Sequence, residues 1–250
     1  MARSLLLRGM LVGLLVGLFV FAFARWVGEP QVDRAIAFET SMDQAKGEPP
    51  EPEIVSRKIQ RGFGLLTGIG VYSTALGGIF GLVFAYARGR FSQSRPRVLS
   101  ALLAGIGFAT IVLTPSLKYP ANPPSVGNPE TIGIRTAAYF LLIATSIIVT
   151  VVSLKAKRLW SKSLGEWNAT LSAIILYVVI VSVVAHFLPP IDEVPAGFPA
   201  SLLWKFRIAS LETQAVMWSI LGLLFGWLTE RAEGVSNMPS QSSVDELRYS

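Results

Sequence analysis

The sequence predicts an all-α fold, a polytopic membrane protein with about six transmembrane helices. Of the 250 residues, 52% are hydrophobic and only 15% are charged, whereas about a quarter of the residues in a soluble protein are charged. The mean hydropathy is +0.52. Long uncharged stretches recur along the chain, and about 20 such residues are needed to cross the hydrocarbon of a bilayer. These observations exclude an ordinary water-soluble protein.

Six stretches are long enough to cross a membrane, and they cover residues 5–24, 62–87, 98–117, 136–154, 167–188 and 208–229. Arg8 interrupts the first stretch and Glu212 interrupts the last. The segments between them are too short for a separate soluble domain. We therefore expect one transmembrane helical domain over residues 1–230, followed by a polar, flexible cytoplasmic tail over residues 231–250.

The first stretch has two interpretations. Its basic start, its apolar run and the small residues Ala22 and Ala24 resemble a cleavable signal peptide. Alternatively it is a transmembrane helix, because it fills a bilayer and its glycines, Gly9, Gly13 and Gly17, repeat every four residues as packing faces do. The prediction of six spans uses the second interpretation, in which residues 5–24 are a transmembrane helix.

The distribution of Lys and Arg predicts the orientation. Basic residues gather at the N-terminus and in two short loops, around residues 88–97 and 155–162. Because Lys and Arg favour the cytoplasmic side of short loops, we expect these segments and both termini to be cytoplasmic. The formal net charge of +6 is then a signal for orientation, and no nucleic-acid partner is expected.

The sequence lacks the residues and motifs that several common metal sites and enzyme active sites require. The chain has no cysteine and one histidine, so neither a thiolate site nor a cluster of histidines can form within it. It also has no phosphate-binding G-x-x-x-x-G-K-[ST] loop, no H-E-x-x-H and no G-x-S-x-G. We therefore do not expect an enzyme, nor a tightly bound cofactor.

The outer loops contain the unusual residues. In the first, FARWVGEPQVDRAIAFE, a short interfacial helix is expected to start near Glu29, so that Glu29 and Asp33 share one face, with Glu39 further along. The third, from Thr114 to Arg135, is rich in Pro and Asn and cannot be regular helix throughout. Its Asn-Pro steps at Asn122 and Asn128 are turns or, alternatively, part of a binding site.

The fifth loop brings the single histidine, His186, close in sequence to Asp192 and Glu193. Imidazole with carboxylate suits divalent transition metals, although an interfacial histidine can equally be a hydrogen-bonded boundary residue. Glu212 lies within the last stretch, and intramembrane carboxylates are costly enough to be functional candidates. It could also form a structural ion pair with Arg207, Arg135 or Arg61.

Four strings occurring in order, FARWVGEPQVDRAIAFE, EIVSRKIQRGFGLLTGI, SLKYPANPPSVGNPETIGIRT and LPPIDEVPAGFPASLLWKFRIASLETQ, resemble the CbtA family of predicted cobalt transporter subunits. The resemblance covers the chain from Arg8 to about Glu230. It implies a multi-pass protein of the bacterial inner membrane, connected with cobalt uptake for cobalamin synthesis. It also implies a small, single-span, histidine-bearing partner, CbtB. The family is described with five spans, so five helices remain possible.

Two functions are open from the sequence. The first is a channel or carrier subunit whose acidic outer loops admit transported Co²⁺, with further ligands supplied by the histidine-bearing partner. The candidate metal ligands are then His186, Asp192, Glu193, Glu29, Asp33, Glu39 and Glu212. The second is a scaffold or assembly subunit in the lipid bilayer that docks another protein through its outer loops. A homo-oligomer is compatible with either.

Overall fold

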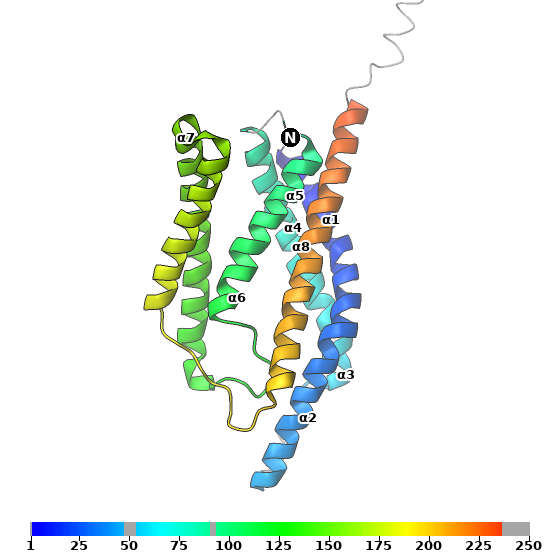
Figure 1. Ribbon diagram of the computed structural model, residues 1–250. Helices are drawn as coiled ribbons and strands as arrows, with labels where there is room; N and C mark the ends of the chain where they lie inside the picture. Colours follow the sequence, from blue (N-terminus) through cyan, green and yellow to red (C-terminus); the bar gives the residue numbers. More distant parts are fainter. Residues whose placement is uncertain (1, 48–53, 91–93, 237–250) are drawn as a thin grey trace, which may run out of the picture. The chain divides into compact units, whose positions relative to one another are not determined.

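The computed structural model describes residues 2–47, 54–90 and 94–236. Within those ranges the chain is helical with connecting loops and has no strand (Figure 1). The elements are, in chain order, α1 (Ala2–Phe23), η1 (Ala24–Gly28), α2 (Glu29–Lys46), α3 (Arg57–Ile59), η2 (Gln60–Gly64), α4 (Leu65–Arg88), α5 (Pro96–Gly107), η3 (Phe108–Leu113), α6 (Thr114–Lys118), η4 (Pro129–Thr131), α7 (Ile132–Phe187) and α8 (Ala200–Ser236). The predicted all-α membrane fold is confirmed.

Five continuous helical stretches are long and apolar enough to cross a membrane, and they are Ala2–Lys46, Arg57–Arg88, Pro96–Lys118, Pro129–Phe187 and Ala200–Gly234. All six predicted spans lie within these five, except that the fifth extends one residue beyond Phe187. Six become five because α7 contains the fourth predicted span and all but that last residue of the fifth.

Helix α7 is two helices that meet at Gly165. As one straight helix, Pro129–Phe187 would be roughly 90 Å long, about three times the thickness of the hydrocarbon. Gly165 instead has φ 75° and ψ 163°, a conformation essentially reserved for glycine. The chain folds back there, so that two arms, residues 132–164 and 166–187, run side by side (Figure 1). The predicted loop between these spans is therefore helical on both sides of one sharp break.

Other predicted loops are also more helical than expected. The interfacial helix expected near Glu29 is α2, which begins at Glu29, but it continues directly from α1 through the π-helical turn η1. The fifth loop ends at Ala200, where α8 begins. Of the predicted flexible tail, residues 231–236 continue α8, and residues 237–250 lie outside the described residues.

The chain divides into two compact units. Unit 1 comprises residues 1–21, 62–105 and 216–250, and unit 2 comprises residues 22–61 and 106–215. The expectation of one membrane domain over residues 1–230 stays a prediction.

Unit 1 is organised by close contact between α1 and α4. A Cβ added at Gly9 would lie 2.1 Å from the carbonyl oxygen of Gly77, and one added at Gly13 would lie 2.1 Å from that of Ser73. Only glycine permits this approach of two backbones. The predicted packing role of Gly9 and Gly13 is thus confirmed, whereas Gly68 has no such neighbour within 4 Å and does not pack in this way.

One end of unit 1 collects segments that were predicted to be cytoplasmic. Arg88 Nη2 lies 2.8 Å from Glu233 Oε2, and Arg97 Nε lies 3.0 Å from Glu230 Oε1. Near the start of α1, the backbone of Leu5 is close to Gly81 of α4. The N-terminal segment, the basic loop around residues 88–97 and the end of α8 therefore share one end, as the orientation requires. The membrane face that this end occupies stays a prediction.

Candidate functional site

All three predicted outer loops lie in unit 2, where they are joined by an apolar cluster. Ala35 of α2, Val126 of the third loop, and Phe198 and Leu202 of the fifth loop and α8 are buried together. Phe38 packs edge-on against Phe198, with ring centroids 5.0 Å apart. Burial of these side chains holds together three segments that are far apart in the sequence. We call this assembly the loop junction.

The first loop contains an arginine clasp. Arg57 Nη2 lies 2.5 Å from Glu29 Oε2, and Arg57 Nε lies 3.0 Å from Asp33 Oδ1. Arg61 Nη1 is 3.7 Å from the other oxygen of Asp33. Glu29 is only 7% exposed, so its charge requires this partner. The predicted shared face of Glu29 and Asp33 is confirmed, and two basic residues neutralise it.

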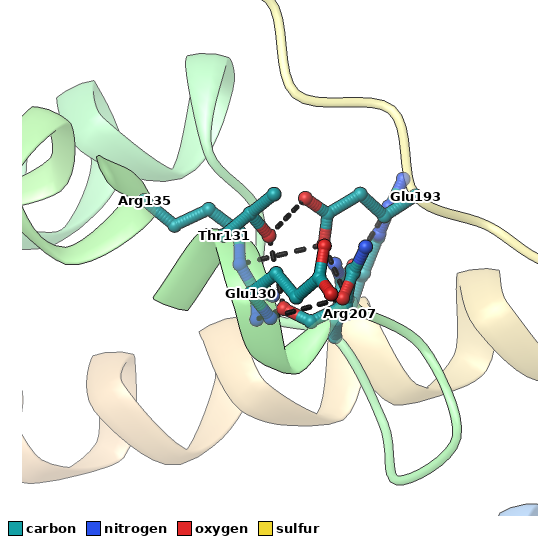
Figure 2. A network of polar contacts seen from close by, with 7 residues as sticks. Glu130, Thr131, Arg135, Glu193 and Arg207 are labelled. Carbon is teal, nitrogen blue, oxygen red and sulfur yellow. Dashed lines mark hydrogen bonds and ion pairs between the residues drawn. The ribbon is translucent and has the colours of Figure 1, made fainter. Parts of the chain in front are cut away.

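A second network joins the third and fifth loops around Glu193 (Figure 2). The backbone N–H of Asn128 donates to Glu193 Oε2 at 2.7 Å, and the hydroxyl of Thr131 donates to Glu193 Oε1. Arg135 Nε lies 3.4 Å from Glu193 Oε2. The carboxylate of Glu193 is therefore contacted by a backbone N–H and a hydroxyl from the third loop and by a guanidinium from the start of α7.

Asn128 organises the third loop for this network. Its side-chain oxygen caps η4 by accepting from the N–H of Glu130 at 2.9 Å, and its carbonyl accepts from Arg135 Nη2 at 3.1 Å. Gly127 has φ 133°, and a Cβ there would lie 2.5 Å from Arg135 Nη1. A glycine is therefore needed where the arginine crosses the loop. The turn expected at Asn128 is confirmed, and its alternative role in binding stays a prediction.

The network lowers the pKa of the Glu193 carboxyl below its usual value of 4.5. The hydrogen bond from Thr131 is the largest cause, followed by that from Asn128, and the charge of Arg135 adds to them. All three favour the ionised form. Glu193 is therefore negatively charged at neutral pH.

Two more hydrogen bonds connect these loops. Tyr119 donates from its hydroxyl to the carbonyl of Pro189 at 2.8 Å, and Arg207 Nη2 donates to Asn122 Oδ1 at 3.0 Å. Asn122, the other Asn-Pro step, therefore ties the third loop to α8.

The seven predicted metal ligands do not share one place. Glu29 and Asp33 lie in the arginine clasp, and Glu193 is held by Arg135. Glu39 is half-buried on α2, while the remaining three, His186, Asp192 and Glu212, are exposed. Within residues 2–47, 54–90 and 94–236, no three His, Cys, Asp or Glu side chains are grouped so that they could hold a metal ion. The assignment of metal ligands stays a prediction.

His186 contacts an aromatic ring, and the arginines considered as partners of Glu212 have other contacts. The ring of His186 stacks edge-on with that of Phe187, at a centroid distance of 5.5 Å. For Glu212, two of the three arginines considered as partners are engaged elsewhere, Arg135 with Glu193 and Arg61 with Asp33. Arg207 contacts Asn122.

Sequence reasoning missed Arg57 as the partner of Glu29, and it missed Arg135 and Thr131 as the partners of Glu193. Arg57 and Arg135 both lie in predicted outer loops, next to the starts of predicted spans. That placement contradicts the usual preference of Arg for the cytoplasmic side, and it could have identified both as partners of buried or networked carboxylates.

Comparison with known proteins identifies the family. The family model described as "Probable cobalt transporter subunit (CbtA)" matches residues 2–230, nearly the whole chain. Searches of the curated proteins and of the solved structures gave no match. The family match agrees with the resemblance of the four sequence strings and with helices able to cross a membrane several times. The chain therefore belongs to the CbtA family, and it is a multi-pass membrane protein and a subunit of a probable cobalt transporter.

Proposed function

We propose that this chain is the membrane subunit through which Co²⁺ or a related divalent cation enters a bacterial cell across the inner membrane, in an uptake system linked to cobalamin synthesis. The observation that carries the proposal is the loop junction. It gathers segments of all three acidic or kinked outer loops in one unit, around Ala35, Val126 and Phe198. Family membership supplies the cargo.

The carboxylates of the loop junction suit an entrance more than a permanent metal site. Glu29, Asp33 and Glu193 each contact an arginine. An arriving cation competes with that guanidinium for the same carboxylate oxygens. The competition lowers the affinity of the site for the cation and favours release of the cation inward. Conduction needs such weak binding, because a tightly held ion does not leave.

A partner completes the coordination in this proposal. The chain has one histidine and no cysteine, and no group of three ligands lies together in its described residues. A small single-span partner bearing histidines, CbtB-like, would add the imidazole ligands that cobalt prefers. The description of the family as a subunit supports a partner, and its histidines are part of this proposal.

Uptake of radioactive cobalt tests the proposal. Cells expressing the chain with its histidine-bearing partner should accumulate more cobalt than cells with an empty vector. A variant with alanine at all seven predicted ligands should lose that gain. Glu166→Ala is the matched control, because Glu166 is an exposed carboxylate outside the three loops, paired with Lys157. Equal accumulation in wild-type and empty-vector cells would disprove transport.

A second candidate, a scaffold that docks another protein, is favoured by the same ion pairs. If Arg57 and Arg135 only hold the loops in shape, the carboxylates are structural. Uptake would then tolerate their single replacement but would fail when the apolar cluster is disrupted, for instance by Phe198→Asp. Calorimetry on the purified protein would also detect no bound Co²⁺.

A further inference from the structure

Unit 2 contains a cluster of hydroxyl groups between η3, α6 and the two arms of α7. The hydroxyl of Tyr177 lies 2.6 Å from Ser146 Oγ and 2.7 Å from Thr114 Oγ1. Thr110 Oγ1 lies 3.1 Å from Thr150 Oγ1. We call these five residues the hydroxyl seam. It joins both arms of α7 to η3 and α6.

Three of the five residues of the hydroxyl seam lie near the middle of predicted spans, whereas Thr114 and Thr150 lie nearer the ends of theirs. Thr110, Ser146 and Tyr177 are each close to the middle of their apolar stretches, residues 98–117, 136–154 and 167–188. The hydroxyl side chains of Thr110 and Ser146 are buried, and Ser146 is fully so. Transporters commonly bind their cargo at this depth, between helices whose regular geometry is interrupted.

The seam coincides with such an interruption. Residues Phe108–Leu113 form the π-helical turn η3, and π-turns occur often at functional sites. Two of its carbonyl oxygens accept side-chain hydroxyls, that of Ala109 from Thr114 at 2.9 Å and that of Thr110 from Ser146 at 2.8 Å. Backbone carbonyls and hydroxyls thus present a set of neutral oxygen atoms in a region that is otherwise apolar.

Hydroxyls between membrane helices can also serve only to hold the helices together. Ser153 argues against that role alone. It lies on the same face of α7 as Ser146 and Thr150, it is 6% exposed, and its hydroxyl has no hydrogen-bond partner. A seam built only for packing would gain nothing from a buried, unpaired hydroxyl, which costs free energy.

We propose that the hydroxyl seam is the place where the divalent cation crosses the middle of the membrane with its bound water. This inference rests on the proposed transport function. Water molecules bound to the cation donate hydrogen bonds to the hydroxyl and carbonyl oxygens, and Ser153 extends this row of oxygens along α7. The neutral lining binds the cation weakly, as conduction requires. In the present conformation the hydroxyls bond to one another, so the seam is closed.

Isosteric variants test the seam. Thr150→Val and Tyr177→Phe remove hydroxyls and keep the side-chain volume, so each should reduce cobalt uptake per folded molecule about tenfold. Thr150→Ser restores a hydroxyl and should restore most of the rate. Thr170→Val is the matched control in the second arm of α7, because Thr170 donates only to the carbonyl of Glu166 in its own helix. Folded protein is quantified by size-exclusion chromatography of a fluorescent fusion.

Cysteine labelling provides a second measurement. The chain has no native cysteine, so Ser146→Cys introduces a single thiol at the seam with little change in volume. It should react with a small cationic thiosulfonate reagent during transport, and the modification should block uptake. Ala173→Cys is the control, because Ala173 is also buried, on the other arm of α7, but is apolar.

The outcomes separate the two proposals. If wild-type protein with its partner takes up no cobalt, the transport function fails and this inference fails with it. If wild-type protein transports cobalt while Thr150→Val and Tyr177→Phe transport at wild-type rates, only the inference fails. The same holds if Ser146→Cys reacts no faster than Ala173→Cys. Reduced uptake explained entirely by less folded protein would show that the seam only packs the helices.

Discussion

Arg135 at the start of α7 lies 3.4 Å from the carboxylate of Glu193 in the fifth loop. The pair joins two segments 58 positions apart, and Asn128 and Thr131 complete the bonding of the same carboxylate. Together with the apolar cluster, such a contact holds the third and fifth loops against each other.

Replacing Glu193 by Gln should weaken the loop junction. The neutral amide loses the charged contact with Arg135 and keeps only one acceptor oxygen for the two donors, the N–H of Asn128 and the hydroxyl of Thr131. We expect the melting temperature to fall by about 2 to 4 °C, measured on detergent-solubilised protein. Asp192→Asn is the control, because Asp192 is the exposed neighbour of Glu193. Equal melting temperatures for all three proteins would show that the network contributes no stability.

The stabilising effect of Glu193 should depend on pH. Its pKa is lowered in the folded protein from the usual 4.5, so the folded state favours the ionised form more than the unfolded state does. The contribution is therefore complete above the unfolded pKa and is lost as the pH falls through the folded pKa. The difference in melting temperature between wild type and Glu193→Gln should be constant from pH 8 to about pH 6 and should shrink in more acidic buffer. A difference that grows on acidification would reverse the assigned direction.

Arg57 should matter more than Arg61 for stability. Arg57→Met leaves the buried carboxylate of Glu29 without its guanidinium, and a lost hydrogen bond to a charged group costs about 1.5 to 3 kcal/mol. Arg61→Met removes only a 3.7 Å contact between half-exposed side chains, and such pairs contribute at most about 1 kcal/mol. Urea denaturation of both variants tests the ranking. A larger effect of Arg61→Met would place the main support of α2 elsewhere.

Gly13→Ala should destabilise unit 1 severely. The added methyl would lie 2.1 Å from the backbone carbonyl of Ser73, so α1 and α4 must separate. Overpacking of this kind typically costs about 1 to 3 kcal/mol and occasionally more. Gly68→Ala is the matched control on α4, since nothing lies within 4 Å of its added methyl. The yield of monodisperse protein after extraction measures both, and a normal yield for Gly13→Ala would contradict the close approach of the helices.

Gly165→Ala should affect the fold through backbone strain alone. No atom lies within 4 Å of an added Cβ, but φ is 75° and ψ is 163°, where an L-residue pays about 1 to 3 kcal/mol. We expect a lower melting temperature and faster proteolysis near residue 165. Ser163→Ala, two residues earlier on the exposed surface, is the control. Unchanged stability would indicate that the two arms of α7 can join by another backbone conformation.

The spans could be predicted because each is specified locally. Apolar stretches such as residues 62–87 need no knowledge of their neighbours to favour the bilayer, since burial of their surface in lipid suffices. The helix near Glu29 was likewise predicted from Pro30 and the helical spacing of Val32 and Ile36. A turn between residues 154 and 167 was predicted, but the sharp break at Gly165 between two helical arms was not, because a single glycine between Leu164 and Glu166 carries no signal for one backbone conformation.

The candidate ligands were predicted as types of residue but not as a site. Glu29 and Asp33 were expected on one face because their spacing of four fixes that relationship within a helix. Their partner Arg57, and the pairing of Arg135 with Glu193, depend on which loops meet, and no local pattern encodes that. The hydroxyl seam was missed for the same reason, as Ser, Thr and Tyr are unremarkable within an apolar stretch until helices bring their hydroxyls together.

The sequence by itself determined that this chain is an all-α membrane protein, which stretches are apolar enough to cross a membrane, and that the loops between them carry acidic and kinked segments. These properties follow from hydrophobicity and local geometry, which act on each stretch independently. Only the tertiary structure decided which carboxylate pairs with which arginine, that three of these loops share one apolar cluster, and that hydroxyls from three helical segments meet. Those relationships depend on contacts between distant segments, and their energies arise only when the helices pack.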